Sequence, residues 1–336
     1  MATKHIMAGK LEVLRTPEDR FKNLTNYPFV SHYVFLEQGL RMHYLDEGGK
    51  NYPIVLLLHG EPSWSFLYRN IIPPLVKQGY RVIAPDLIGF GKSDKFIEGS
   101  MYTYQNHTLW LKDFIERLNL SKINLYCHDW GGMIALRIVA SNPNLFAAVA
   151  VSYAFLFTGE DNIPESFLSW QNFSQTDPEF LAGTIVNSGT YSKLPIDIQE
   201  AYNAPFPSET YKAAARQFPM MIPTDPQSPE ARTNVFLRKE LMKFDKPFLT
   251  VWGDNHDEMW RGKDKILQAE ILGAKGQNHQ VLHADHFLQE DKASDIVEIL
   301  INFFLKSSNN GIHTRPSAEQ DHSFNYDVPK DTPFNV

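Results

Sequence analysis

The segment INLYCHDWGGMIALR at residues 123–137 constrains the fold more than any other part of the chain. It begins with a short apolar run, passes through small and glycine residues, and continues with the three- and four-residue apolar spacing of a helix. Such an abrupt turn from a strand into a helix pushes one side chain out above a sheet. The segment therefore predicts an α/β fold in which the Asp129 carboxylate projects above the sheet.

Further apolar runs bounded by Gly, Pro or Asp predict the other strands. They occupy residues 32–36, 40–45, 54–58, 81–84, 147–153, 248–252 and 280–282, with helical patterns between several of them. The first two runs are separated by a short Gln-Gly turn, which indicates an antiparallel hairpin. Strands that are apolar on both faces and alternate with helices favour a mostly parallel sheet of about eight strands with right-handed crossovers.

The alternation of strands and helices stops between residues 158 and 244, where the chain is rich in aromatic residues and proline. Helical patterns around residues 165–173 and 209–218 predict that residues 158–244 form a helical cap domain over one end of the sheet. A plain second domain is the alternative. The core domain is then expected at residues 11–157 and 245–306, and the polar residues 307–336 predict a disordered tail.

Composition excludes several classes of protein. The 336 residues include 32 Lys and Arg against 39 Asp and Glu, a net charge of −7, so we expect no binding to nucleic acid. The longest apolar run is too short to span a membrane and the start lacks a signal-peptide pattern, so we expect a cytoplasmic protein. The single cysteine excludes an intrachain disulfide, and the histidines show no metal-ligand spacing.

The turn at Asp129 has the spacing of a nucleophile elbow, Gly-x-nucleophile-x-Gly. Asp129 takes the nucleophile position and Gly131 the last position, while Cys127 replaces the first glycine. A serine nucleophile is therefore excluded at this turn, and a carboxylate nucleophile is predicted. The alternative is that Asp129 only caps the helix that follows.

The sequence His59-Gly60-Glu61 follows the apolar run at 54–58. In a sheet of this kind such a turn offers a backbone N–H as one half of an oxyanion hole, and the Trp130 N–H, next to the nucleophile, would be the other half. The alternative is a loop shaped by Gly and Pro, in which His59 is hydrogen-bonded only for structure.

A general base and an acid are expected later in the chain. His286 follows the last predicted strand, which is the place of the base in the order nucleophile, acid, histidine. The acid that orients it is expected after the run at 248–252. Asp257 is our preferred candidate and Asp254 the second, because the slot after the preceding strand holds no carboxylate.

Six stretches together resemble the haloalkane dehalogenases of the α/β-hydrolase superfamily. They are HGEPSW, APDLIGFGKSDK, YTYQNHTLWL, CHDWGG, AYNAPFPSETYKAAARQFP and DHFLQED, and the similarity covers residues 11–305. It is greatest to the subfamily whose catalytic acid follows the seventh strand. The resemblance implies an α/β-hydrolase fold with an eight-stranded sheet and a helical cap.

The resemblance also implies a role for each candidate residue. Asp129 would form a covalent alkyl ester, and water activated by His286 would hydrolyse it to an alcohol, a halide and a proton. Trp130 and Trp170 would bind the halide, while the amides of Glu61 and Trp130 would form the oxyanion hole. Small halogenated hydrocarbons, water and halide would be the partners, with no metal or cofactor, in a monomer or weak homo-oligomer acting in detoxification.

The sequence departs from the family pattern near the site. His128 stands where the family usually has Gln, and Asp285 stands where Gly is usual. Asp257 requires a one-residue insertion relative to the family's acid.

Three alternatives use the same scaffold. An epoxide hydrolase would combine the Asp129 and His286 pair with cap tyrosines, for which Tyr191, Tyr202 and Tyr211 are available. A light-emitting monooxygenase is a second alternative. A protein that only binds a hydrophobic ligand is the third.

Overall fold

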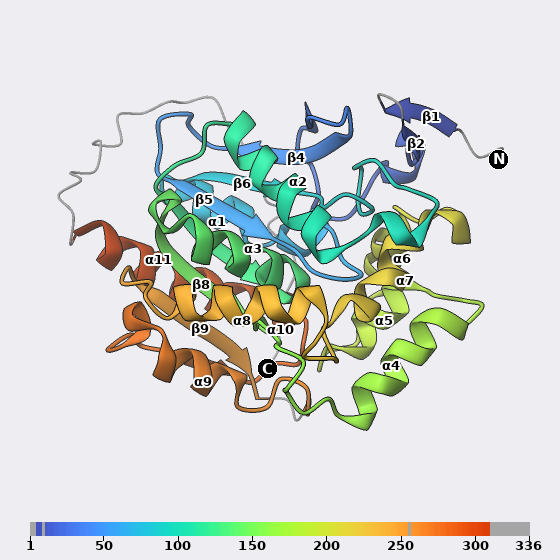
Figure 1. The fold of residues 1–336 in the computed structure, drawn as a ribbon. Coiled ribbons are helices and arrows are strands. Elements are labelled where there is room, and N and C mark those ends of the chain that lie inside the picture. Colours follow the sequence, from blue (N-terminus) through green and yellow to red (C-terminus); the bar gives the residue numbers. More distant parts are fainter. Residues whose placement is uncertain (1–4, 9–10, 255–256, 310–336) are drawn as a thin grey trace.

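One eight-stranded sheet organises the computed structural model, which describes residues 5–8, 11–254 and 257–309 (Figure 1). The strand order is β10-β9-β8-β7-β5-β6-β4-β3. The strands are β3 (His32–Phe35), β4 (Arg41–Glu47), β5 (Ile54–Leu58), β6 (Arg81–Pro85), β7 (Ile123–His128), β8 (Phe146–Ser152), β9 (Phe248–Gly253) and β10 (Gln280–Leu282). Each predicted strand is present, and the predicted mostly parallel sheet is confirmed.

Burial explains why the middle strands are continuous apolar runs. All six residues of β7 are buried, because helices cover both faces of the parallel part of the sheet. The hairpin predicted between β3 and β4 is present and antiparallel. A separate antiparallel pair, β1 (His5–Ala8) and β2 (Leu11–Leu14), was not predicted.

Helices lie in layers on the two faces of the sheet (Figure 1). On one face α3 (Asp129–Ser141) packs between α2 (Tyr104–Arg117) and α8 (Pro229–Leu241). Other core helices are α1 (Ile72–Lys77), α9 (Lys263–Glu270), α10 (Leu288–Asp291) and α11 (Ala293–Asn309). Contacts of α1 with β6 and of α11 with β8 join these two helices to the sheet.

The residues between β8 and β9 form the predicted run of helices. They include α4 (Glu165–Thr176), α5 (Ala182–Ser188), α6 (Ile196–Asn203) and α7 (Ala213–Gln217), followed by α8. Helices α4 to α7 gather at one end of the sheet, at the lower right of Figure 1. The single helix predicted around 209–218 is instead a 3-10 turn at Glu209–Tyr211, the short α7 and a second 3-10 turn at Phe218–Met221 that contains Pro219.

The carboxyl end of α11 differs from the sequence prediction. The helix continues to Asn309, so the first three residues of the predicted tail are helical. The remainder of that tail, residues 310–336, lies outside the described residues.

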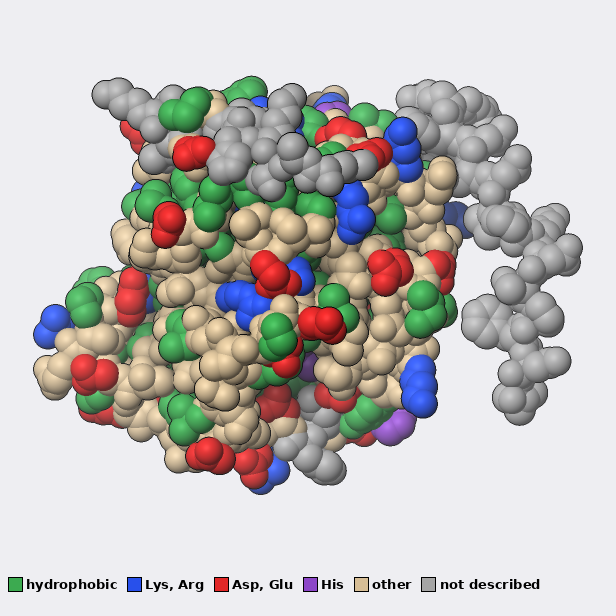
Figure 2. All heavy atoms as spheres, turned by 90° about the vertical axis from the view of Figure 1, so that its right-hand side faces the viewer, with side chains coloured by type: hydrophobic (Ala, Val, Ile, Leu, Met, Phe, Trp, Pro, Cys, Tyr) green, Lys and Arg blue, Asp and Glu red, His purple; other side chains and the backbone are tan. Residues whose placement is uncertain are grey.

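Two global properties bear on partners. Among the helices that the structure describes, none combines the length and the apolar character needed to span a membrane. On the face drawn in Figure 2, acidic and basic described side chains are interspersed rather than gathered into one extended patch.

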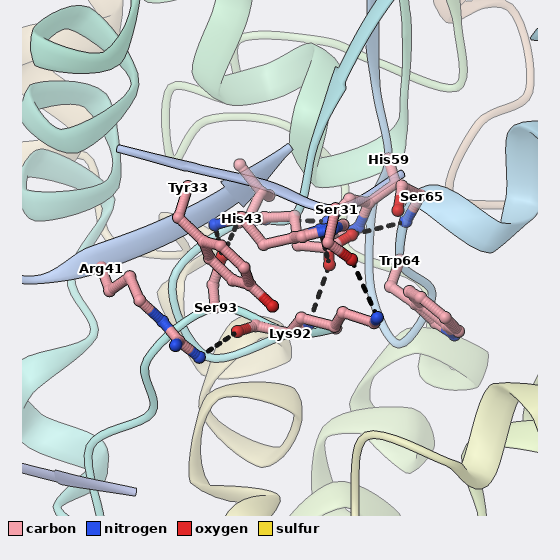
Figure 3. Close-up of polar contacts among 12 residues, drawn as sticks. Ser31, Tyr33, Arg41, His43, His59, Trp64, Ser65, Lys92 and Ser93 are labelled. Atoms are coloured by element: carbon pink, nitrogen blue, oxygen red, sulfur yellow. Dashed lines mark hydrogen bonds and ion pairs between the residues drawn. The ribbon is translucent and has the colours of Figure 1, made fainter. Parts of the chain in front are cut away.

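A buried carboxylate, Asp86, contacts the residues labelled His43, Ser65 and Lys92 in Figure 3. It follows β6 and is fully buried. Its oxygens accept the backbone N–H groups of Ser65 and Lys92, each at 2.8 Å, and Oδ2 lies 2.7 Å from His43 Nδ1. Through Ser65 this network fixes the loop that leaves β5.

His59 at the end of β5 belongs to the same region (Figure 3). Its Nε2 accepts the Leu87 N–H at 2.9 Å, so Nδ1 carries the proton and donates to the Gly60 carbonyl at 2.9 Å. Burial lowers the pKa of His59, so the ring is neutral. These contacts agree with the alternative in which His59 is hydrogen-bonded only for structure.

Replacing Asp86 with Ala should destabilise the protein by about 3 kcal/mol or more, because buried donors lose their acceptor. Urea unfolding followed by circular dichroism measures the change. The control is Asp19→Ala, an exposed carboxylate that should change stability by less than about 0.5 kcal/mol. Equal effects of the two substitutions would contradict the role of the Asp86 network.

Candidate active site

A cavity of about 660 Å³ lies where β7 and the helices between β8 and β9 meet. The core contributes Glu61, Asp129, Trp130 and His286 to its wall, and the insertion contributes Phe167, Trp170 and Ile185. Apolar and aromatic side chains share the wall with several ionisable groups, a combination typical of a site for a small molecule.

Asp129 occupies the predicted position between β7 and α3. Its backbone φ is +51°, in the left-handed region that non-glycine residues adopt rarely and mostly at functional sites. A Cβ added to Gly131 would overlap the carbonyl oxygens of Leu58 and His59, and one added to Gly60 would overlap the Asp129 carboxylate. Both glycines are therefore needed for β5 and the turn at Asp129 to approach each other.

The predicted oxyanion-hole amides both face the Asp129 carboxylate. The Glu61 N–H donates to Asp129 Oδ1 at 2.8 Å, and the Trp130 N–H also donates to this carboxylate. Burial raises the pKa of Asp129 above its usual value, while His286 and the two amides act in the opposite direction. The carboxylate is thus mostly desolvated and oriented by backbone donors.

His286 approaches the other carboxylate oxygen. Its Nε2 lies 3.8 Å from Asp129 Oδ2, close enough for one water molecule to be shared between them. The ring stacks on Tyr153 with centroids 4.8 Å apart. The structure therefore brings together Asp129 and His286, which lie 157 positions apart in the sequence.

His128, the departure from the family pattern, supports this histidine. Its Nε2 donates to the His286 carbonyl at 2.9 Å, and the two rings lie 4.8 Å apart. Burial and the neighbouring His286 lower the pKa of His128, so this ring is neutral. The sequence marked His128 as unusual but did not indicate that it contacts the backbone of His286.

The two candidate acids lie in different places. Asp257 is in the cavity wall, where its Oδ1 accepts the Met259 N–H at 2.9 Å. It makes no hydrogen bond with His286 within the described residues. Asp254 is exposed instead, with its carboxylate bonded to Tyr191 Oη at 3.0 Å and His283 Nδ1 at 2.9 Å. The geometry therefore favours Asp257 over Asp254.

Three tryptophans line the cavity, the two predicted halide ligands Trp130 and Trp170 and, in addition, Trp260. Trp130 lies on α3 beside Asp129, and Trp170 lies on α4, where it stacks on Phe173 with centroids 5.5 Å apart. In the described part of the chain neither indole N–H has a hydrogen-bond partner, in contrast to Trp64, which donates to a carbonyl. Both indoles line the cavity as pure donors without an acceptor.

The cap tyrosines named for the epoxide alternative are elsewhere. Tyr202 is buried and bonded to Glu290, Tyr211 is buried outside the cavity wall, and Tyr191 is on the surface with Asp254. The described cavity wall contains no tyrosine. Among the same described residues, His, Cys, Asp and Glu side chains form no cluster of three that would hold a metal ion.

Two contributions to the site were not predicted from sequence. Tyr153, at φ +49°, supports the His286 ring, and the buried Glu61 side chain lies in the cavity wall. Only the backbone of Glu61 had been singled out. A signal for its side chain would be the carboxyl group that Glu61 adds to the turn His59-Gly60-Glu61-Pro62, directly after a fully apolar strand.

Comparisons with known proteins identify the fold and the family of the chain. A family model described as the alpha/beta hydrolase fold matches residues 53–293. A haloalkane dehalogenase of Psychrobacter cryohalolentis is 47% identical over 298 residues, which cover 87% of this chain and 98% of that protein. One from Mycobacterium marinum is 42% identical, with 87% and 100% covered.

A solved structure of a haloalkane dehalogenase is also similar to this chain. A haloalkane dehalogenase of Paraglaciecola agarilytica, described as tetrameric, superposes with a TM-score of 0.81 at 33% identity, covering 88% of this chain and 98% of that one. Identity at this level over nearly the whole length of each relative establishes common descent. The chain therefore belongs to the haloalkane dehalogenase family of α/β hydrolases.

Proposed function

We propose that the protein hydrolyses small haloalkanes to an alcohol, a halide ion and a proton. The observation that carries the proposal is a cavity lined by the Asp129 carboxylate and by the indoles of Trp130 and Trp170, whose N–H groups have no hydrogen-bond partner among the described residues. A carboxylate is a nucleophile without losing a proton, and indoles donate hydrogen bonds without competing as nucleophiles. The membership of the family supports the same reaction.

In the first step Asp129 Oδ2 attacks the carbon that bears the halogen, and the carbon–halogen bond breaks in line. The bonding electron pair leaves with the halide. Trp130 and Trp170 donate hydrogen bonds to the charge that develops on the halogen, which stabilises the transition state more than the neutral substrate. Burial of the cavity strengthens these interactions because little water competes.

In the second step water attacks the Asp129 carboxyl carbon of the ester. His286 takes a proton from this water, and its position 3.8 Å from Asp129 Oδ2 supports that role. The negative charge that develops on Oδ1 is held by the amides of Glu61 and Trp130, of which the former already donates to this atom. When the intermediate collapses, the bond to the alkyl oxygen breaks, and this oxygen leaves as the alcohol with the hydroxyl proton of the intermediate. The Asp129 carboxylate is regenerated, and the protonated His286 releases its proton to solvent.

We assign the acid that steadies the charged His286 ring to Asp257. Its place in the cavity wall supports the assignment, and catalytic hydrogen bonds often tighten only in the complex with substrate. An epoxide hydrolase is the second candidate, but the described cavity wall offers no tyrosine to protonate an epoxide oxygen. Halide release from 1-bromobutane and diol formation from styrene oxide separate the two activities.

His286→Phe should stop turnover after one halide is released, because the ester cannot be hydrolysed without the base. Intact-protein mass spectrometry after incubation with 1-bromobutane should show one added butyl group, located on Asp129 by peptide analysis. His283→Phe is the matched control, since that histidine is exposed on the surface, and it should turn over without an adduct. An unmodified His286→Phe protein would argue for a protein that only binds its ligand.

Asp257→Asn should lower the rate of ester hydrolysis about a hundredfold or more, because the charged His286 ring loses its stabilising carboxylate. Asp254→Asn should leave the rate within about threefold of the native protein, since Asp254 lies outside the cavity wall. Steady-state halide release measures both. The reverse order of effects would transfer the role to Asp254.

Trp170→Phe should weaken bromide binding about tenfold or more, because one hydrogen bond to a charged group is lost while the aromatic surface is kept. Calorimetric titration with sodium bromide measures the affinity. Trp110→Phe changes an indole of α2 outside the cavity wall and should leave the affinity unchanged. Similar affinities of native protein and Trp170→Phe would remove Trp170 from the halide site.

A further inference from the structure

The Glu61 side chain is an ionisable group in the cavity wall to which the proposed steps give no role. The residue is only 7% exposed, and its Oε1 is buried without a hydrogen-bond partner. Within the described residues no Lys or Arg forms an ion pair with it. An ionised carboxylate in this position would be desolvated and uncompensated, which is strongly unfavourable.

The nearest charge is the Asp129 carboxylate, to which the Glu61 backbone donates. Two carboxyl groups that share a desolvated site do not both ionise readily, so one of them holds a proton. Asp129 receives two amide hydrogen bonds and faces His286, all of which favour its charged form. Glu61 has no such donors, so the proton belongs on Glu61.

Other charged groups also face this cavity. Asp257, Glu258, Arg261 and His286 are in its wall. Burial, followed by the Asp129 charge, raises the pKa of Glu61 well above its usual range. Both the contacts and the surroundings of Glu61 therefore favour its neutral form.

A neutral Glu61 matters for the reaction because the cavity has to hold the halide beside the Asp129 carboxylate once hydrolysis of the ester has regenerated that carboxylate. A further negative charge on Glu61, in a wall that already contains the carboxyl groups of Asp257 and Glu258, would repel the halide, and such repulsion is strong in a medium of low dielectric constant. Ionisation of Glu61 would therefore oppose halide capture.

We propose that Glu61 and Asp129 form a carboxyl pair carrying one proton, held by Glu61, and that loss of this proton sets the alkaline limit of halide binding. The proposal rests on the proposed function, because it assigns the charge state of that halide site. In this proposal the charge of the Glu61 side chain controls halide binding. The Glu61 backbone amide keeps its separate role of donating to Asp129.

Bromide affinity at two pH values tests the pair. Glu61→Gln keeps the backbone amide and the size of the side chain but cannot ionise. At pH 7 Glu61→Gln should bind bromide no more tightly than the native protein, because Glu61 is already neutral at that pH. At pH 10 the native protein should bind about tenfold or more weakly than at pH 7, and Glu61→Gln should lose much less.

Glu258→Gln is the matched control, because it removes another glutamate of the same wall. It should keep the alkaline loss of affinity. Circular dichroism at both pH values verifies that each variant remains folded. Infrared spectroscopy at pH 7 gives an independent measure, since the native spectrum should contain a protonated-carboxyl band that is missing from Glu61→Gln.

Three results would overturn the proposal. Glu61→Gln could bind bromide more than about fivefold tighter at pH 7, which would mean that Glu61 is charged in the native protein. It could keep the full alkaline loss, or its infrared spectrum could retain the protonated-carboxyl band. Failure of the proposed function looks different, since the native protein would then bind no bromide and release no halide at either pH.

Discussion

The hydrogen bond from the Glu61 amide to Asp129 Oδ1, at 2.8 Å, is the contact on which the site depends. It joins the loop after β5 to the turn after β7, two neighbouring parallel strands whose carboxyl ends meet at one edge of the sheet. Asp129 reaches it only with φ at +51° and with Gly60 and Gly131 in the adjoining turns. The packing of the buried strands on either side offsets the free energy of this backbone strain.

Desolvation gives the cavity its chemistry. The same burial that raises the pKa of Asp129 leaves the Glu61 carboxyl without partners and removes water from the indoles. In such surroundings each hydrogen bond and each charge counts for more than it would in water. A nucleophilic carboxylate, donors for a departing anion and a neutral second carboxyl then become parts of one electrostatic arrangement.

Local patterns predicted the sheet well because their causes are local. The apolar run of β7, the glycines after it and the helical spacing of α3 occur within a few residues, so the turn at Asp129 could be read from sequence. The helical segment expected around 209–218 is present, but as short pieces rather than one continuous helix. Strands β1 and β2, which form a separate two-stranded sheet, were not predicted.

The sequence by itself determined the strand–turn–helix unit at Asp129, the order of the candidate residues along the chain and the family resemblance. Only the tertiary structure decided that Asp257 faces the cavity while Asp254 is bonded to Tyr191 and His283 on the surface. It alone placed the Glu61 side chain beside Asp129. The reason is physical: backbone turns follow from neighbouring residues, whereas the burial and partners of a side chain depend on segments far apart in the chain.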